Sequence, residues 1–92
     1  MSNYTVIKAD TAIYKDGEGI LGCDMSGLPD DFWALQWDGT NGHVEWGSQP
    51  NTSVKSKSEI ESVLSVSLPT LIERRTARIA EIKAAAKAAA NE

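Results

Sequence analysis

A stretch near the middle of the chain, ALQWDGTNGHVEW, places five turn-forming residues between two short segments in which apolar and polar residues alternate. Alternation with a period of two is typical of a half-buried β-strand, so the two segments predict the arms of an antiparallel hairpin. The apolar positions expected on its inner face are Trp33, Leu35, Trp37, Val44 and Trp46. Tryptophans that point the same way from a hairpin usually belong to the core, so we expect these indoles to be structural.

The pairing register of this hairpin depends on the length of its loop. A two-residue Asn-Gly loop sets Trp37 opposite Trp46, whereas a four-residue loop over residues 39–42 sets Trp37 opposite Val44. Both registers keep the apolar side chains on one face, and a slip of one residue would move them to opposite faces. We therefore expect one of these two registers.

The first twenty residues predict three shorter strands. Residues 4–10 alternate around β-branched side chains and predict the first strand. The Asp-Gly pair at residues 16–17 favours a type I′ turn between two more strands, because both of its central positions require a positive φ. A two-residue turn at this point sets Ile13 opposite Ile20.

The size and charge of the chain limit its function. It has 92 residues and a formal net charge of −4. A chain of this length buries only about 60% of the surface that its unfolded form exposes, which leaves little room for a catalytic pocket. Residues 1–70 carry ten carboxylates against four lysines, and residues 71–92 carry five basic side chains against three acidic ones. Because phosphate contacts need a concentrated basic face, we expect no binding of nucleic acid.

A short helix is predicted after a loop over residues 47–53. Ser56 or Ser58 can cap this helix, and the acidic residues that follow complement its dipole. Its apolar stripe consists of Ile60, Val63 and Leu64. We expect this stripe to pack on the sheet.

A long C-terminal helix is expected to begin at Pro69, with Ser67 as its cap, and to run to about Ala90. The alanine-rich end, KAAAKAAA, favours helix even without packing. Together these elements predict an α+β chain with an antiparallel sheet of four or five strands, a short packing helix and a long projecting helix. We divide it into a sheet domain over residues 1–67 and an interaction helix over residues 68–92.

Apolar residues recur along the long helix at the spacing of a coiled-coil heptad, with one basic exception. These positions are Leu68, Ile72, Arg75, Ile79, Ile82, Ala86 and Ala89. Docking of the helix on the sheet would give a compact monomer, and pairing with its own copies would give a helical bundle. We expect self-association, because Pro69 restarts the helix and the acidic sheet domain is poorly suited to hosting it. Arg75 would then reach Glu73 or Glu81 of a neighbouring copy.

The reactive side chains form no catalytic, metal or cofactor motif. Cys23 lacks basic neighbours, which predicts a buried and unreactive thiol. Cys23 and His43, the single histidine, are too few ligands for a zinc site. We expect His43 to be a surface residue in a turn. Asp30 and Asp31 lack the spacing of a calcium-binding loop, so we expect their carboxylates to be solvated. We therefore expect a protein that is not an enzyme and needs no cofactor.

The remaining candidates for function are surfaces for protein partners, at the hairpin tip and along the long helix. The candidate partner-binding residues are Thr40, Asn41, His43, Ile72, Arg75, Ile79 and Ile82.

The segment LPDDFWALQWDGTNGHVEW, residues 28–46, resembles the signature of small tail-associated proteins of tailed bacteriophages, which are often encoded beside tail-fibre genes. In that family a Leu-Pro stretch precedes an Ala-Leu-Gln-Trp-(Asp/Tyr)-Gly-Thr-x-Gly-x-(Ile/Val)-Glu-aromatic run, and a helical region of variable sequence follows. The resemblance covers about a fifth of the chain. The region after it lacks the better known tail-fibre assembly domain.

This resemblance implies a non-enzymatic accessory or assembly protein that binds a phage tail-fibre polypeptide, or its own copies, through the hairpin and the C-terminal helix. A structural component of the virion tail is the alternative, and a small acidic inhibitor of a host protein ranks behind both. The N-terminal segment lacks the basic and apolar parts of a secretion signal, and no stretch is apolar enough to span a membrane. We therefore expect the protein in the host cytoplasm during infection, with the virion tail as the alternative location.

Overall fold

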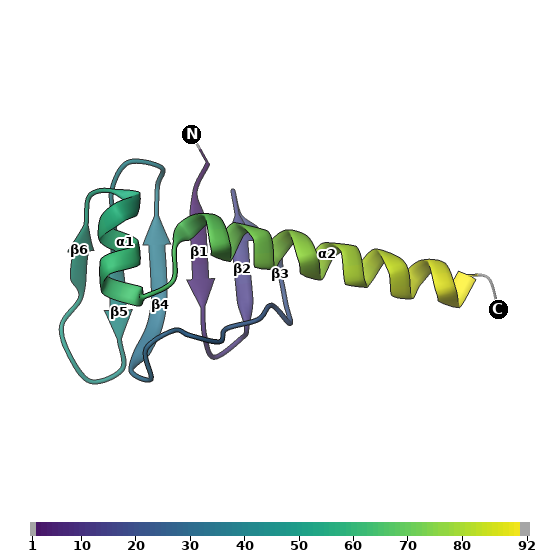
Figure 1. The fold of residues 1–92 in the computed structure, drawn as a ribbon, viewed down its shortest axis with the longest axis horizontal. Helices are drawn as coiled ribbons and strands as arrows, with labels where there is room; N and C mark the ends of the chain where they lie inside the picture. Colours follow the sequence, from purple (N-terminus) through teal and green to yellow (C-terminus); the bar gives the residue numbers. More distant parts are fainter. Residues whose placement is uncertain (1, 91–92) are drawn as a thin grey trace.

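The computed structural model describes the backbone of residues 2–90 and the side chains of residues 2–88. The strands are β1 (Tyr4–Ile7), β2 (Ala12–Lys15), β3 (Glu18–Ile20), β4 (Phe32–Trp37), β5 (Gly42–Trp46) and β6 (Thr52–Val54), followed by the helices α1 (Lys57–Leu64) and α2 (Leu68–Ala90). All six strands form one antiparallel sheet in the order β3-β2-β1-β4-β5-β6 (Figure 1). The predicted α+β class is confirmed, with one strand more than the largest expected number.

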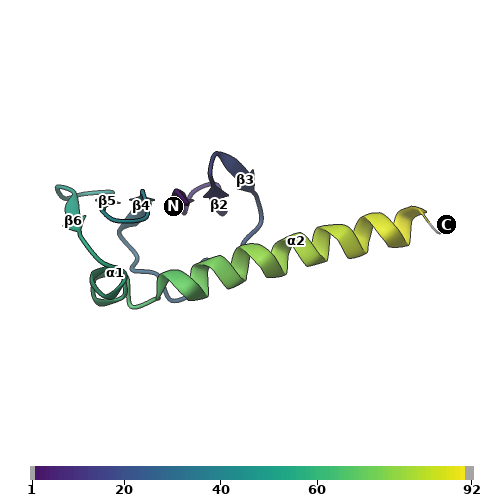
Figure 2. The same cartoon turned by 90° about the horizontal axis from the view of Figure 1, so that it is seen from above.

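Both helices lie on the same side of the sheet (Figure 2). The core between them and the sheet contains apolar side chains from every strand except the short edge strand β3, whose Ile20 packs against it half-buried. Its fully buried large residues are Val6, Ile13, Leu35, Val44, Val54, Ile60, Leu64, Leu68 and Leu71. The first turns of α2 therefore belong to the body of the molecule, because Leu68 and Leu71 complete its core.

The β2–β3 hairpin has the predicted turn and register. Asp16 and Gly17 have φ angles of 50° and 86°, the two positive values that a type I′ turn requires. Ile13 lies opposite Ile20, as expected.

Both registers predicted for the β4–β5 hairpin are wrong. The structure pairs Trp37 with Gly42 and Leu35 with Val44, which leaves residues 38–41 as the loop. Asp38 holds this loop, because its Oδ1 accepts hydrogen bonds from the backbone N–H groups of residues 40 and 41 at 2.8 and 2.7 Å. The observed register differs from the four-residue prediction by two positions, so Leu35, Trp37 and Val44 remain on the inner face as predicted.

Trp33 does not lie on the inner face, contrary to the prediction. The register shifts between Phe32 and Ala34, which marks a β-bulge with one extra residue on β4. Phe32 takes the inner position opposite Trp46 and is 3% exposed, whereas Trp33 is 54% exposed. The bulge therefore exchanges the roles of two adjacent aromatic residues.

Residues 47–53 are not all loop, because Thr52 and Ser53 belong to β6. This strand pairs with β5, and the indole N–H of Trp46 donates to the Thr52 hydroxyl at 2.9 Å. Val54 at the end of the strand is fully buried.

Serine side chains cap both helices, as predicted. The hydroxyl of Ser56 accepts the N–H of Glu59 at 3.1 Å at the start of α1. The hydroxyl of Ser67 accepts the N–H of Thr70 at 3.2 Å at the start of α2. Capping of this kind satisfies backbone donors that the first helical turn leaves unpaired, so each serine defines where its helix begins.

The long helix α2 docks on the sheet with its first half and projects with its second half. It crosses over β1, β2 and β3 and then continues beyond the edge of the sheet (Figure 1). All side chains described over residues 80–88 are exposed. We call residues 80–90 the overhang; it gives the molecule its long dimension of 49 Å against 28 and 19 Å.

Candidate functional site

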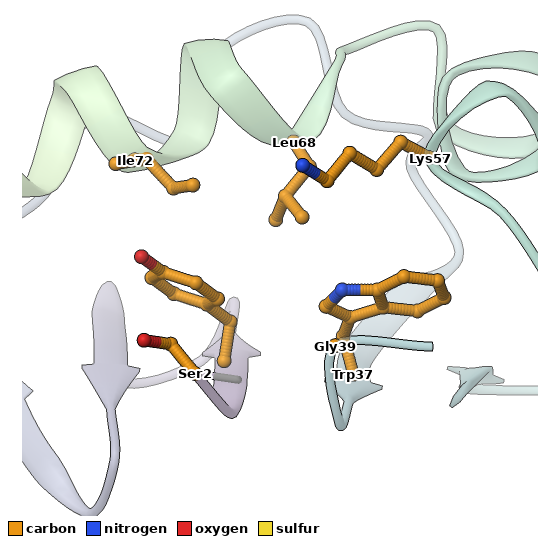
Figure 3. A pocket seen from close by; sticks show the side chains of 7 residues that line it. Ser2, Trp37, Gly39, Lys57, Leu68 and Ile72 are labelled. Carbon is orange, nitrogen blue, oxygen red and sulfur yellow. The ribbon is translucent and has the colours of Figure 1, made fainter. Parts of the chain in front are cut away.

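A cavity of about 260 Å³ lies between α2 and the sheet, at the end of the sheet nearest the β4–β5 loop. Its lining residues are Ser2, Tyr4, Trp37, Gly39, Lys57, Leu68 and Ile72 (Figure 3). They come from β1, β4, α1, α2 and two connecting segments. This volume is slightly below the usual range for a drug-sized ligand, so the cavity fits a small molecule or a single side chain.

The floor and roof of the cavity are mainly apolar, but Ser2, Tyr4, Trp37 and Lys57 bring polar groups to its lining. Trp37 is 5% exposed, and its indole nitrogen points into the space below Leu68 (Figure 3). Among the residues that the structure describes, this N–H has no hydrogen-bond partner, and it is accessible from the cavity. The Lys57 side chain extends across Leu68 toward the mouth (Figure 3). No carboxylate lines the cavity, and Lys57 forms no ion pair within the described part of the chain.

The hairpin-tip candidates lie at a different place, toward the sheet face that no helix covers. Asn41 and His43 line a shallow depression there, together with Thr5 and Gln36. His43 Nε2 lies 3.1 Å from the carboxylate of Glu45, and the Thr5 hydroxyl donates to the Gln36 amide oxygen at 2.8 Å. These polar side chains are therefore held by partners at neighbouring positions of the sheet.

The loop at the hairpin tip contains a carboxylate with a perturbed pKa. The backbone N–H groups of Asn41 and Thr40 hold the pKa of Asp38 below its ordinary value, because both donate to the ionised form. Thr40 itself is exposed beside this carboxylate. The perturbation belongs to loop capping and needs no catalytic role.

The four helix candidates do not share one face toward solvent. Ile72 lines the cavity and packs against the core, and Ile79 is half-buried. Ile82 is 43% exposed at the base of the overhang. Arg75 is buried against the sheet, with 9% of its surface exposed.

Arg75 binds groups of its own chain. Its Nε donates to the Ile13 carbonyl at 3.2 Å, and its Nη2 donates to the Glu18 carbonyl at 3.0 Å and to the Glu18 carboxylate at 3.3 Å. These contacts tie α2 to β2 and β3. We expected Arg75 to reach Glu73 or Glu81 of another copy. The structure instead places its Nε and Nη2 donors on groups of its own chain.

An apolar stripe begins at the half-buried Ile79 and continues uncovered onto the overhang. Ile79, Ile82 and Ala86 follow one another at spacings of three and four residues, so they lie along one face of the helix. Lys83 and Lys87 lie beside this stripe and are exposed. The stripe continues the line of the docked residues beyond the sheet, where the described chain offers nothing to cover it.

Among the described residues, Cys23 and the potential metal ligands form no metal site. Cys23 is buried as predicted, and burial raises the pKa of its thiol, which keeps it protonated and unreactive. No three histidine, cysteine or carboxylate side chains within the described residues gather as a metal ion would require. No helix in the described part of the chain is both long and apolar enough to cross a membrane.

The sequence prediction assigned Trp37 only to the core and did not single out Ser2, Tyr4 or Lys57. These residues are far apart in the sequence and meet only because α2 folds back over the start of β1. No local pattern marks such a cavity.

Comparisons with protein-family models, curated protein sequences and solved structures find no match to this chain.

Proposed function

We propose that this protein is a non-enzymatic accessory or assembly protein that acts by binding another protein through the overhang. The observation that carries this proposal is a stripe formed by the exposed Ile82 and Ala86, next to the half-buried Ile79, on a helix whose first half is docked on the sheet. Exposed apolar surface on a small protein marks an interaction site, because leaving it in water forgoes about 0.025 kcal/mol per Å².

The resemblance of residues 28–46 to phage tail-associated proteins supports a tail-fibre polypeptide as the partner. The charge distribution also supports association between copies of this chain. Residues 1–70 carry a net charge of −6, and the overhang carries Lys83 and Lys87 against Glu81, so the overhang of one copy complements the body of another. Binding to its own copies would present several overhangs together.

Sedimentation and capture experiments test this proposal. We expect the mass of the intact chain to rise with concentration over the micromolar range, or the chain to retain a trimeric tail-fibre fragment from the same genome. Ile82→Glu places a charge in the stripe and should abolish the interaction. Ala84→Glu adds the same charge on the opposite face of the helix and should leave it intact.

Two results would contradict the proposal. One is an intact chain that stays monomeric and captures no fibre. The other is an interaction that Ile82→Glu and Ala84→Glu weaken equally, because the stripe would then not be the contact surface.

A further inference from the structure

The cavity beside Trp37 has features of a binding site that the proposed function does not use. It is lined on two sides by apolar groups, including the buried Leu68 and the half-buried Ile72. A small branched aliphatic group fits such a space, because these side chains supply contacts that water cannot replace.

The polar groups of the cavity determine what a ligand must carry in addition to an aliphatic group. An N–H that loses its contact with water and gains no other acceptor is costly, and tryptophan N–H groups usually find an acceptor when they are buried. The Trp37 indole is 95% removed from solvent and points its N–H into the cavity, where no described residue accepts it (Figure 3). No buried side-chain nitrogen or oxygen among the described residues lacks a partner, so solvent reaches this N–H through the cavity, and an occupant that displaces the solvent gains by bringing a hydrogen-bond acceptor to this position.

Charge decides which acceptor is preferred. The lining contains one cation, Lys57, and no carboxylate, although the chain as a whole carries a net charge of −4. The ammonium group extends toward the cavity across Leu68 (Figure 3) and has no ion-pair partner within the described residues. An anionic acceptor gains more from this charge than a neutral carbonyl does.

We propose that the cavity binds a carboxylate carried on a short branched aliphatic group. The aliphatic group lies between Leu68 and Ile72, one carboxylate oxygen accepts the Trp37 N–H, and the charge is balanced by Lys57. The same chemistry is presented by a free small carboxylic acid and by the C-terminal residue of a protein chain. This proposal does not depend on the overhang.

Titration of the ¹⁵N-labelled full chain, followed at the indole N–H resonances, tests this inference. Trp33→Phe and Trp46→Phe assign the Trp37 signal by elimination. The probes are 4-methylpentanoate for a free acid, N-acetyl-leucine for a chain terminus, and 4-methylpentanamide as the uncharged control. We expect both carboxylates to move the Trp37 signal downfield with a Kd of roughly 1 mM, and the amide to bind more weakly. The tighter of the two carboxylates identifies the source.

Matched lysine variants separate a specific site from general attraction of anions. Lys57→Gln should weaken carboxylate binding about three- to fivefold, the usual effect of a partly exposed ion pair, and Lys55→Gln should leave it unchanged. The inference is overturned if the Trp37 signal does not respond, if the amide binds as well as the carboxylates, or if the two lysine variants behave alike. None of these results bears on association through the overhang, which Ile82→Glu tests separately.

Discussion

Replacement of Arg75 by methionine measures how much its guanidinium contributes to docking of α2. Methionine keeps a long unbranched side chain in the same space and removes the donors to Ile13 and Glu18. The substitution therefore tests the hydrogen bonds with little change in packing.

The expected loss follows from the hydrogen-bonding state of the two carbonyl groups. The two-residue turn makes Lys15–Glu18 and Ile13–Ile20 hydrogen-bonded pairs of the ladder, so each carbonyl that Arg75 contacts already accepts one backbone N–H. Loss of the guanidinium removes a second bond from each carbonyl and leaves neither fully unpaired. The two bonds to the carbonyls contribute about 3 kcal/mol, the bond to the exposed Glu18 carboxylate adds little, and release of the cost of burying the guanidinium offsets about half of the total.

We therefore expect Arg75→Met to lower the free energy of unfolding by about 1–2 kcal/mol, which corresponds to a fall in Tm of roughly 4–16 °C for a chain of this size. Urea unfolding followed by tryptophan fluorescence gives the free energy. Hydrogen exchange at the Ile20 amide should quicken, because β3 is held less firmly. Lys83→Met, on the exposed overhang, should stay within about 0.5 kcal/mol of the wild type.

An equal or increased stability of Arg75→Met would refute this reasoning. It would mean that burial of the guanidinium costs as much as its hydrogen bonds return, as happens with some buried charges. If Lys83→Met destabilised the protein as much as Arg75→Met, the effect of methionine on α2 would come from association between copies and not from loss of the Arg75 hydrogen bonds.

Four further predictions follow from the fold. Trp37→Ala should cost about 3–5 kcal/mol in urea unfolding because the indole is in the core, whereas Trp33→Ala, at the exposed bulge, should cost less than about 0.5 kcal/mol; equal costs would contradict the assigned burial. Gly42→Ala should lower stability by about 2–3 kcal/mol, because a Cβ at this position would overlap a backbone carbonyl of β4, and an unchanged midpoint would exclude the observed register. The folded pKa of Asp38 lies below its ordinary value of 3.8, so its contribution to stability is present above that pH and is lost as pH falls through the folded pKa; Asp38→Ala should reduce the acid dependence of urea stability in this range, and an unaltered dependence would contradict the capping role. Treatment with EDTA should leave Tm unmoved, because the described residues contain no metal-binding group, and a fall in Tm would reveal one.

Local signals in the sequence predicted the elements that local physics determines. The Asp16-Gly17 turn and the serine caps at Ser56 and Ser67 depend on backbone groups only a few residues away. The hairpin at Trp37 was harder because its loop contains several residues able to form a turn. The carboxylate of Asp38 captures two backbone N–H groups and thereby selects the loop, a choice that alternation of apolar residues does not reveal.

Non-local packing explains the remaining differences. Phe32 and Trp33 are adjacent aromatics, so either fits the inner face, and the bulge that decides between them forms only when β4 pairs with β5. Arg75 interrupts a heptad pattern, but the surface it meets consists of carbonyl groups at the edge of the sheet. Leu71 lies off the heptad line and yet is fully buried, because α2 packs on a sheet and not on another helix. The cavity beside Trp37 has the same origin and could not be predicted from any single segment.

The division of α2 into a docked half and an overhang also separates two kinds of mutational constraint. Changes at Leu68, Leu71 or Arg75 disturb the core or its attachment to the sheet, so folding limits what these positions accept. Beyond Ile82 the alanine-rich helix is sustained by its own propensity, and substitutions there leave the fold intact as long as they favour helix. Over generations, the overhang is therefore free to change in sequence while the sheet that carries it stays the same.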